Sequence, residues 1–169
     1  MTRTLGIALI ALGMTVGPTQ AQSDAVDPFN GTWTLNIEKT KELSGGESPV
    51  HEIITFTISD DNVQHYEVEI QYSDDTPMRK GWYSSKYNEP TFVPYNGTVS
   101  DDPPGAEVMT IKVDERTHYR IARTRDGSNA RYVMMRRLSE DHQSYISAGI
   151  MIDGRADLYR WMDRVPDSE

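Results

Sequence analysis

The chain has 169 residues, a formal net charge of −9 and no cysteine. This length predicts one domain, and the lack of cysteine excludes disulfides, thiol catalysis and iron–sulfur chemistry. The acidic balance makes nucleic acids and anionic lipid surfaces poor partners, because like charges repel one another over long range.

Residues 1–21 have the composition of a secretory signal peptide. A positive start at Arg3 precedes an apolar run over residues 5–16, and small residues lead to Ala21. The run is too short to cross a bilayer core of about 30 Å as a helix. We therefore expect cleavage after Ala21, a mature domain of residues 22–169, a bacterial periplasmic location and no stable membrane insertion.

The first predicted strand covers residues 32–36, and residues 38–43 favour at most one helical turn. Two strands with a clear apolar face follow at residues 50–59 and 65–72. Their apolar faces comprise Ile54, Phe56 and Ile58 in the first and Tyr66, Val68, Ile70 and Tyr72 in the second. Alternation with a period of two predicts half-buried strands joined as a hairpin, with both apolar faces turned inward.

The middle of the chain is aromatic but less regular. Residues 79–87 carry Trp82 and Tyr83 without a clean apolar face. Residues 91–95 then lead into Asn96-Gly97, a strong tight-turn pair.

The second half of the chain alternates more regularly. Predicted strands lie at residues 109–113, 117–125, 130–138, 142–152 and 155–165. Turn pairs such as Asp126-Gly127 separate them, and no helix of three turns is predicted. About nine or ten short strands, with turns about every ten to twelve residues, indicate an all-β fold. Because consecutive segments form hairpins, we expect an antiparallel up-and-down β-barrel of about 8–10 strands.

The segment Phe29-Asn30-Gly31-Thr32-Trp33-Thr34-Leu35-Asn36 resembles the Gly-x-Trp opening of lipocalin-like (calycin) barrels. It is most similar to an exported bacterial subgroup that begins Phe-x-Gly-Thr-Trp-x-Leu-Asn. The similarity continues at residues 93–97, 125–127, 138–141 and 158–165. The chain departs from lipocalins proper in lacking a disulfide, which leaves the strand number open.

This resemblance implies a barrel that binds a small apolar molecule inside. It also implies that Trp33 closes one end, with Arg160 or Arg164 stacked on the indole as a cation–π contact. From the residues alone, Trp33 could equally be an ordinary core aromatic.

No motif for a metal, a phosphate or an activated nucleophile is present. The histidines His51, His65, His118 and His142 lack metal-ligand spacing, and there is no Gly-rich phosphate loop and no Gly-x-Ser-x-Gly elbow. We therefore expect no metal and no cofactor, and we set aside nucleotide enzymes and α/β hydrolases.

Two predicted strands place arginine inside the barrel. Tyr119, Ile121 and Arg123 are alternate residues of one predicted strand, so they share a face, which we expect to point inward. His118 then lies on the outer face. Residues 130–138 contain arginine on both parities, so one arginine faces inward whichever face is buried. A buried arginine needs an anionic partner. That partner is either a carboxylate of the protein or a carboxylate of a ligand, unless the arginine lies near the open rim of the barrel, and all three alternatives stay open.

The aromatic and cationic interior predicts binding of one small apolar or aromatic molecule, with a carboxylate or a phenol as its polar group. The expected ligand-binding residues are Phe56, Tyr66, Tyr72, Trp82, Tyr83, Tyr132, Arg137 and Tyr145. Core packing is the alternative role for any single tyrosine. We expect a monomer or a small homo-oligomer.

A second hypothesis is a cofactor-independent lyase, isomerase or cyclase that uses the same pocket. Tyr119, with a pKa lowered by a neighbouring arginine, would be the base, Arg123 would stabilise an oxyanion, and His142 would shuttle protons. A third hypothesis is an envelope-associated structural protein with a core filled by side chains. An interior volume below roughly 300 Å³ favours the third, since ligand pockets usually exceed that size.

Overall fold

The computed structural model describes residues 26–100, 105–152, 154 and 156–166. The predicted signal peptide lies outside these described residues. The elements in chain order are β1 (Gly31–Leu35), α1 (Ile37–Ser44), β2 (His51–Ile58), β3 (Val63–Gln71), β4 (Arg79–Lys86), β5 (Val93–Tyr95), the 3-10 helix η1 (Thr98–Ser100), β6 (Ala106–Asp114), β7 (Thr117–Thr124), β8 (Ala130–Leu138), β9 (Ser144–Met151) and β10 (Ala156–Arg164).

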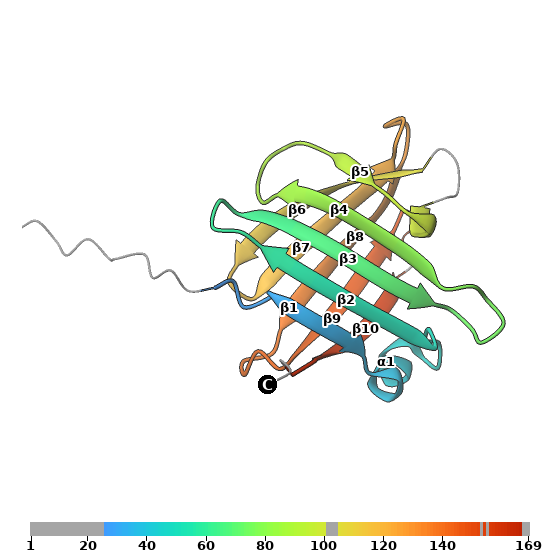
Figure 1. Cartoon of the computed structure of the whole chain (residues 1–169). Coiled ribbons are helices and arrows are strands. Elements are labelled where there is room, and N and C mark those ends of the chain that lie inside the picture. The colour runs from blue at the N-terminus through green and yellow to red at the C-terminus, as the bar shows by residue number, and fades with distance from the viewer. Residues whose placement is uncertain (1–25, 101–104, 153, 155, 167–169) are drawn as a thin grey trace, which may run out of the picture.

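These strands form one antiparallel sheet that curls into a barrel (Figure 1). The sheet order runs from β4 through β3, β2 and β1 to β10, and then through consecutive strands back to β5. The first and last strands are therefore neighbours, with Trp33 opposite Arg164. The predicted all-β, up-and-down barrel is confirmed, and it has ten strands among the described residues.

The barrel closes where β4 meets the chain just after β5. Trp82 and Asn96 form an isolated bridge there, with backbone N–H···O distances of 3.2 and 3.0 Å. Gly97 has a φ of 89°, and a Cβ on it would lie 2.3 Å from the carbonyl oxygen of Lys80. Only glycine tolerates this approach, so the Asn96-Gly97 turn is also what lets the two edges of the sheet meet.

One end of the barrel is filled by aromatic side chains around Trp33. The indole is fully buried, and its Nε1–H donates to the carbonyl oxygen of Phe29 at 2.9 Å. The guanidinium of Arg164 lies 4.1 Å from the centroid of the Trp33 ring. Of the two arginines expected over the indole, Arg164 is therefore the one in place. Arg160 instead pairs with Glu52 inside the barrel.

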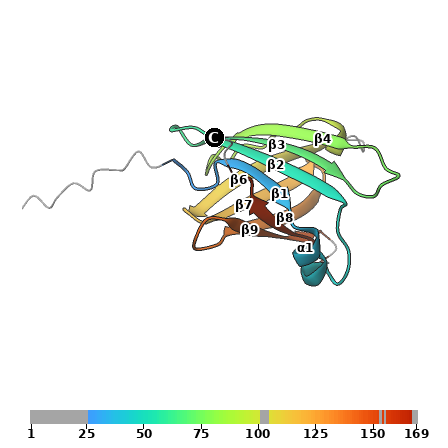
Figure 2. The same ribbon diagram turned by 60° about the horizontal axis from the view of Figure 1, so that its bottom comes forward.

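An eight-residue helix, α1, follows β1 and lies at one end of the barrel (Figure 2). The Asn36 side chain caps it by accepting from the Lys39 N–H at 3.0 Å. Thr40 Oγ1 accepts from the backbone N–H of Trp161 in β10 at 2.9 Å. The helix exceeds the single turn that was expected, because packing on β10 stabilises a segment too short to persist alone. No helix in the described part of the chain is long and apolar enough to cross a membrane.

The predicted orientation of β7 is wrong by one residue. After Thr117 at its first position, its buried side chains are His118, Arg120 and Ala122, so Tyr119 and Arg123 face outward. Side chains on neighbouring strands that lie directly opposite one another share a face of the sheet. The orientation of β7 is therefore coupled to that of β8.

In β8 the buried residues are Met134, Arg136 and Leu138, and Arg120 lies directly opposite Met134. The outer face of this part of the barrel exposes the apolar side chains of Val133 and Ile150 beside the outward-facing Arg123 and Arg137. β7 and β8 therefore place Arg120 and Arg136 inside, although apolar side chains lie outside. The apolar side chains on the outside explain why the outer face of β7 was predicted to be the core.

Candidate functional site

A cavity of about 140 Å³ lies inside the barrel. Most of the side chains around it are aromatic, aliphatic or cationic. The lining residues are Glu52, Ile54, Tyr66, Val68, Ile70, Tyr72, Tyr95, Val99, Arg120, Tyr132, Met134, Arg136, Ser147, Leu158 and Arg160. The charged members are three arginines and one glutamate, so the cavity is basic although the chain as a whole is acidic.

Arg120 on β7 is the most isolated charge in this cavity. Its side chain is buried, and its Nη2 donates a weak hydrogen bond to the Met134 sulfur at 3.6 Å. Its Nε and Nη1 are buried and have no partner among the described residues. The guanidinium carbon lies 5.2, 5.4 and 5.3 Å from the ring centroids of Tyr66, Tyr95 and Tyr132. The rings offset part of the cost of burying the charge, but no oxygen, nitrogen or sulfur atom of the described residues accepts from Nε or Nη1.

Arg136 on β8 brings a second guanidinium to the same cavity. Its side chain is 2% exposed and lies 5.3 Å from the Phe56 ring centroid and 5.1 Å from that of Tyr66. None of the salt bridges between described residues involves Arg136 or Arg120. The cavity therefore contains two positive charges without a carboxylate partner in the described protein.

The third arginine of the cavity is neutralised. Arg160 Nε donates to Glu52 Oε2 at 2.8 Å, and both side chains are largely buried. A second donor of the same guanidinium, Nη1, bonds the carbonyl oxygen of Tyr159 at 2.7 Å. This pair shows what a compensated arginine looks like in this interior, in contrast to Arg120 and Arg136.

The buried tyrosines Tyr66, Tyr95 and Tyr145 stay protonated at neutral pH. Burial raises the pKa of Tyr66, and this outweighs the opposing effect of Arg120 and Arg136. Burial likewise raises the pKa of Tyr95 and Tyr145 well above the ordinary value. Arg120 and Arg136 therefore do not bring the pKa of Tyr66 below its ordinary value. These hydroxyls can donate hydrogen bonds to a ligand, but they are poor bases.

A chain of buried hydrogen bonds runs beside the cavity. The Tyr83 hydroxyl donates to Gln64 Oε1 at 2.9 Å, and Gln64 Nε2 donates to the Tyr87 hydroxyl. The Tyr87 oxygen lies 2.8 Å from His118 Nδ1. Burial, followed by the positive charges of Lys112 and Arg136, lowers the pKa of His118 to about 3. The imidazole is therefore neutral at pH 7.

Of the predicted ligand-binding residues, Tyr66, Tyr72 and Tyr132 line the cavity. Others contribute to the buried core without lining it, namely Phe56, Tyr83 and Tyr145. The Tyr145 hydroxyl is buried and has no partner among the described residues.

Two predicted ligand-binding residues face away from the cavity. Trp82 is half-exposed on the outer face of β4, and Arg137 is exposed on β8, where it donates to Thr117 Oγ1 at 2.8 Å. Arg137 was predicted to face inward, but its side chain faces outward, and the inward-facing arginine is the neighbouring Arg136.

The three residues of the enzyme hypothesis are not brought together. Tyr119 and Arg123 lie on the outer face of β7, and Arg123 pairs with Glu107 at 3.0 Å. His142 lies in the turn before β9 with a φ of 58°, and its carbonyl accepts from Arg164 Nε at 2.9 Å. Within the described residues, no three His, Asp or Glu side chains gather as a metal site requires.

Sequence reasoning missed Arg120 and Glu52, although a signal for each exists. The Asp126-Gly127 turn joins β7 to β8, so choosing the inward face of one strand sets that of the other. Glu52 shares its parity with Ile54, and a charged residue on an otherwise apolar face marks an unusual interior.

Comparisons with known proteins bear on the fold alone. No protein-family model matches the chain, and no curated protein matches it. Among solved structures, the fluorescent protein UnaG is similar, with a TM-score of 0.53 and 19% sequence identity over 83% of this chain and 100% of that one. A point mutant of UnaG has a TM-score of 0.57 and 15% identity over 85% of this chain and 100% of its own. These similarities show a calycin-like β-barrel fold.

Proposed function

We propose that the protein is an exported calycin-like barrel that binds a small aromatic carboxylate, or a similar organic anion, beside Arg120 and Arg136. One observation carries this proposal: Nε and Nη1 of the buried Arg120 have no partner among the described residues. Arginine keeps its charge in proteins, and a buried charge without a counter-charge is unfavourable. A ligand carboxylate supplies both the missing charge and acceptors for these donors.

The size of the cavity favours a ligand with a single ring. Its volume is about 140 Å³, and a cavity of about 150 Å³ in another protein holds benzene. Tyr66, Tyr95 and Tyr132 supply aromatic walls, and Met134 supplies a polarizable contact. Drug-sized ligands occupy larger pockets, of about 300–1,000 Å³, so a small acid fits this cavity better than a long-chain lipid.

A filled structural core is the second candidate function, because the interior volume lies below roughly 300 Å³. The unpaired donors of Arg120 favour the ligand over this alternative, since a purely structural core gains nothing from an uncompensated charge. The lyase, isomerase or cyclase hypothesis has no comparable support, because Tyr119, Arg123 and His142 lie apart. The signal-peptide pattern and the opening around Trp33 support export in a bacterium.

The proposal is tested by calorimetric titration of protein that has been unfolded and refolded to remove any retained ligand. Benzoate and 4-hydroxybenzoate are the anionic probes, and benzamide is the neutral probe of the same shape. We expect the anions to bind at least about tenfold more tightly than benzamide, because only they form charge-assisted hydrogen bonds. Native mass spectrometry of protein from its own periplasm then identifies the natural ligand by mass.

Two variants make the test specific. Arg120→Met should abolish binding of the anions, whereas Arg137→Met, which removes an exposed arginine of the same barrel half, should leave it unchanged. If no anion binds the refolded wild-type protein, and no small mass accompanies the native protein, the filled-core alternative holds.

A further inference from the structure

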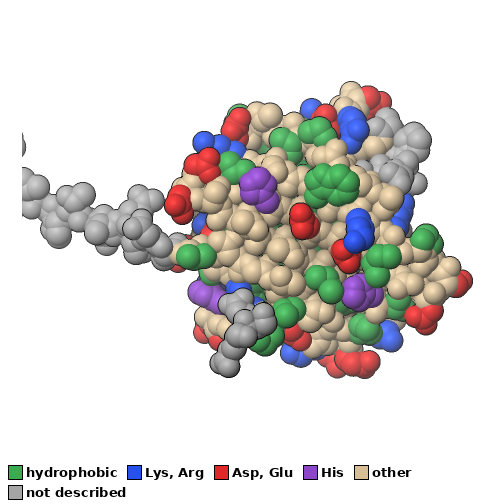
Figure 3. Space-filling view, viewed as in Figure 1, with side chains coloured by type: hydrophobic (Ala, Val, Ile, Leu, Met, Phe, Trp, Pro, Cys, Tyr) green, Lys and Arg blue, Asp and Glu red, His purple; other side chains and the backbone are tan. Residues whose placement is uncertain are grey.

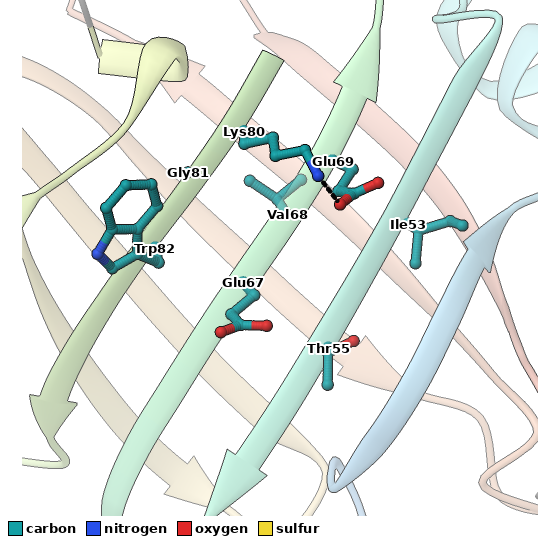
Figure 4. A pocket seen from close by; sticks show the side chains of 8 residues that line it. All are labelled: Ile53, Thr55, Glu67, Val68, Glu69, Lys80, Gly81 and Trp82. Carbon is teal, nitrogen blue, oxygen red and sulfur yellow. Dashed lines mark hydrogen bonds and ion pairs between the residues drawn. The ribbon is translucent and has the colours of Figure 1, made fainter. Parts of the chain in front are cut away.

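A second hollow, of about 460 Å³, lies on the outer face of β2, β3 and β4 (Figure 4). Its lining residues are Ile53, Thr55, Glu67, Val68, Glu69, Lys80, Gly81 and Trp82. The hollow, called the outer groove below, is on the barrel face seen in Figure 3, where isolated hydrophobic side chains lie among charged ones. It opens on the opposite face of the sheet from the interior cavity, because side chains alternate between the two faces of each strand, and of its lining residues only Val68 also lines the cavity.

Trp82 forms one side of the outer groove in a fixed position. Its side chain is 50% exposed, and its backbone is held by the paired hydrogen bonds to Asn96. The ring packs closely against Gly97 in the turn after β5, because a Cβ on this glycine would lie 2.7 Å from the ring. A half-exposed indole on a rigid strand presents an electron-rich face to the solvent, and such a face attracts cations.

The charges of the outer groove do not balance. Lys80 pairs with Glu69, and Figure 4 shows this pair on the side of the groove away from Trp82. Glu67 lies directly opposite Trp82 on the neighbouring strand. Among the described residues, the Glu67 carboxylate takes part in no salt bridge. One negative charge is therefore left beside the exposed ring.

We propose that the outer groove binds an organic monocation, an alkylammonium or guanidinium group, between the Trp82 ring and the Glu67 carboxylate. The cation would neutralise the remaining charge of the groove beside Thr55, which lies opposite Glu67 on β2. The negative charge of the chain, −9 overall, raises the local concentration of cations around the protein. The same group on a free amine or on a lysine or arginine side chain of a peptide satisfies this chemistry.

The test is an NMR titration of the whole mature protein with butylammonium, with ethylguanidinium and with neutral butanol. The two cations should give saturable shifts of the Trp82 indole N–H and of the amides of Glu67 and Lys80, whereas butanol should give none. A lysine-containing and an arginine-containing tripeptide with blocked termini form a second arm. Tighter binding of these peptides than of the free cations identifies a peptide side chain as the source.

Glu67→Gln keeps the size of the side chain at an exposed position, so the variant should fold, and it should weaken cation binding by about fivefold or more. Trp82→Leu removes the ring. Glu47→Gln, at an exposed loop position outside the groove, is the matched control and should bind as the wild type does. Arg120→Met should also bind the cations normally, which separates this site from the interior cavity. Absence of saturable shifts, or equal binding by Glu67→Gln and wild type, would overturn the proposal.

Discussion

The guanidinium of Arg164, in the last strand, covers the ring of Trp33 in the first strand at 4.1 Å. The same side chain donates to three backbone carbonyls that surround the closed end, those of Pro28, Asn30 and His142. One residue therefore joins the N-terminal segment, the turn before β9 and the indole that fills the barrel end.

Replacing Arg164 should destabilise the protein more than its distance from the cavity suggests. Arg164→Met leaves three carbonyls without this donor and removes the cation–π contact, so we expect the free energy of unfolding to fall by about 2–4 kcal/mol. Urea denaturation measures this change. Arg137→Met is the control, because its exposed side chain makes a single bond to Thr117, and it should change stability by less than about 1 kcal/mol. Equal losses in the two variants would contradict the role given to Arg164.

Arg120→Met should have the opposite effect on stability. Methionine fills a similar volume without an uncompensated charge, and replacing buried charges by apolar side chains is often neutral or stabilising, by about 1–4 kcal/mol. We therefore expect the ligand-free variant to unfold at the same or a higher urea concentration than wild type. A clear loss of stability would mean that the contacts with Tyr66, Tyr95 and Tyr132 make Arg120 structural.

The buried pair of Glu52 and Arg160 should behave as a coupled unit. Glu52→Gln leaves the Arg160 charge buried without its partner, which we expect to cost about 3 kcal/mol of stability. The double variant Glu52→Gln with Arg160→Met should recover part of this loss, and a double-mutant cycle measures the coupling. For comparison, Glu69→Gln breaks an exposed pair and should cost at most about 1 kcal/mol. Additive effects at Glu52 and Arg160 would show that the pair is not coupled.

His118 predicts a loss of stability on mild acidification. Its pKa is about 3 in the folded protein, below the unfolded value of about 6.5, so the unfolded chain binds a proton that the folded protein excludes. Stability therefore falls as the pH falls through about 6.5 toward 3, by about 2 kcal/mol between pH 7 and pH 5.

Urea denaturation at several pH values tests this dependence. His118→Gln should flatten it between pH 7 and pH 5, whatever its own stability at pH 7. His65→Gln, which replaces an exposed histidine, should retain the wild-type dependence. An unchanged slope in His118→Gln would show that another group is responsible.

The strand pattern could be predicted from sequence because it depends on local signals. Alternation around Tyr66 and Ile54 and turn pairs such as Asn96-Gly97 mark strands and hairpins without knowledge of the rest of the chain. The length of α1 could not be predicted in this way, since Thr40 is fixed by Trp161, which lies far along the chain.

The site was harder to predict because its polarity contradicts the usual rule. Tyr119 and Ile121 have the composition of a core face, yet they lie outside, while Arg120 and His118 lie inside. Composition alone assigns the wrong face whenever a cavity is charged. Pairing with β8 couples the inward face of β7 to that of β8. The pairing does not show which of the two faces is inward, so it corrects the choice only once the inward face of one strand is known.

Joining the first strand to the last has a kinetic consequence. Hairpins such as β2–β3 join residues close in sequence, whereas Trp33 and Arg164 are separated by nearly the whole domain in the sequence. Loop-closure entropy therefore makes this junction a late step on the folding route, in a topology that typically folds in milliseconds to seconds. Contacts formed after the rate-limiting barrier govern how fast the native state is lost, so Arg164→Met should accelerate unfolding while leaving the refolding rate nearly constant.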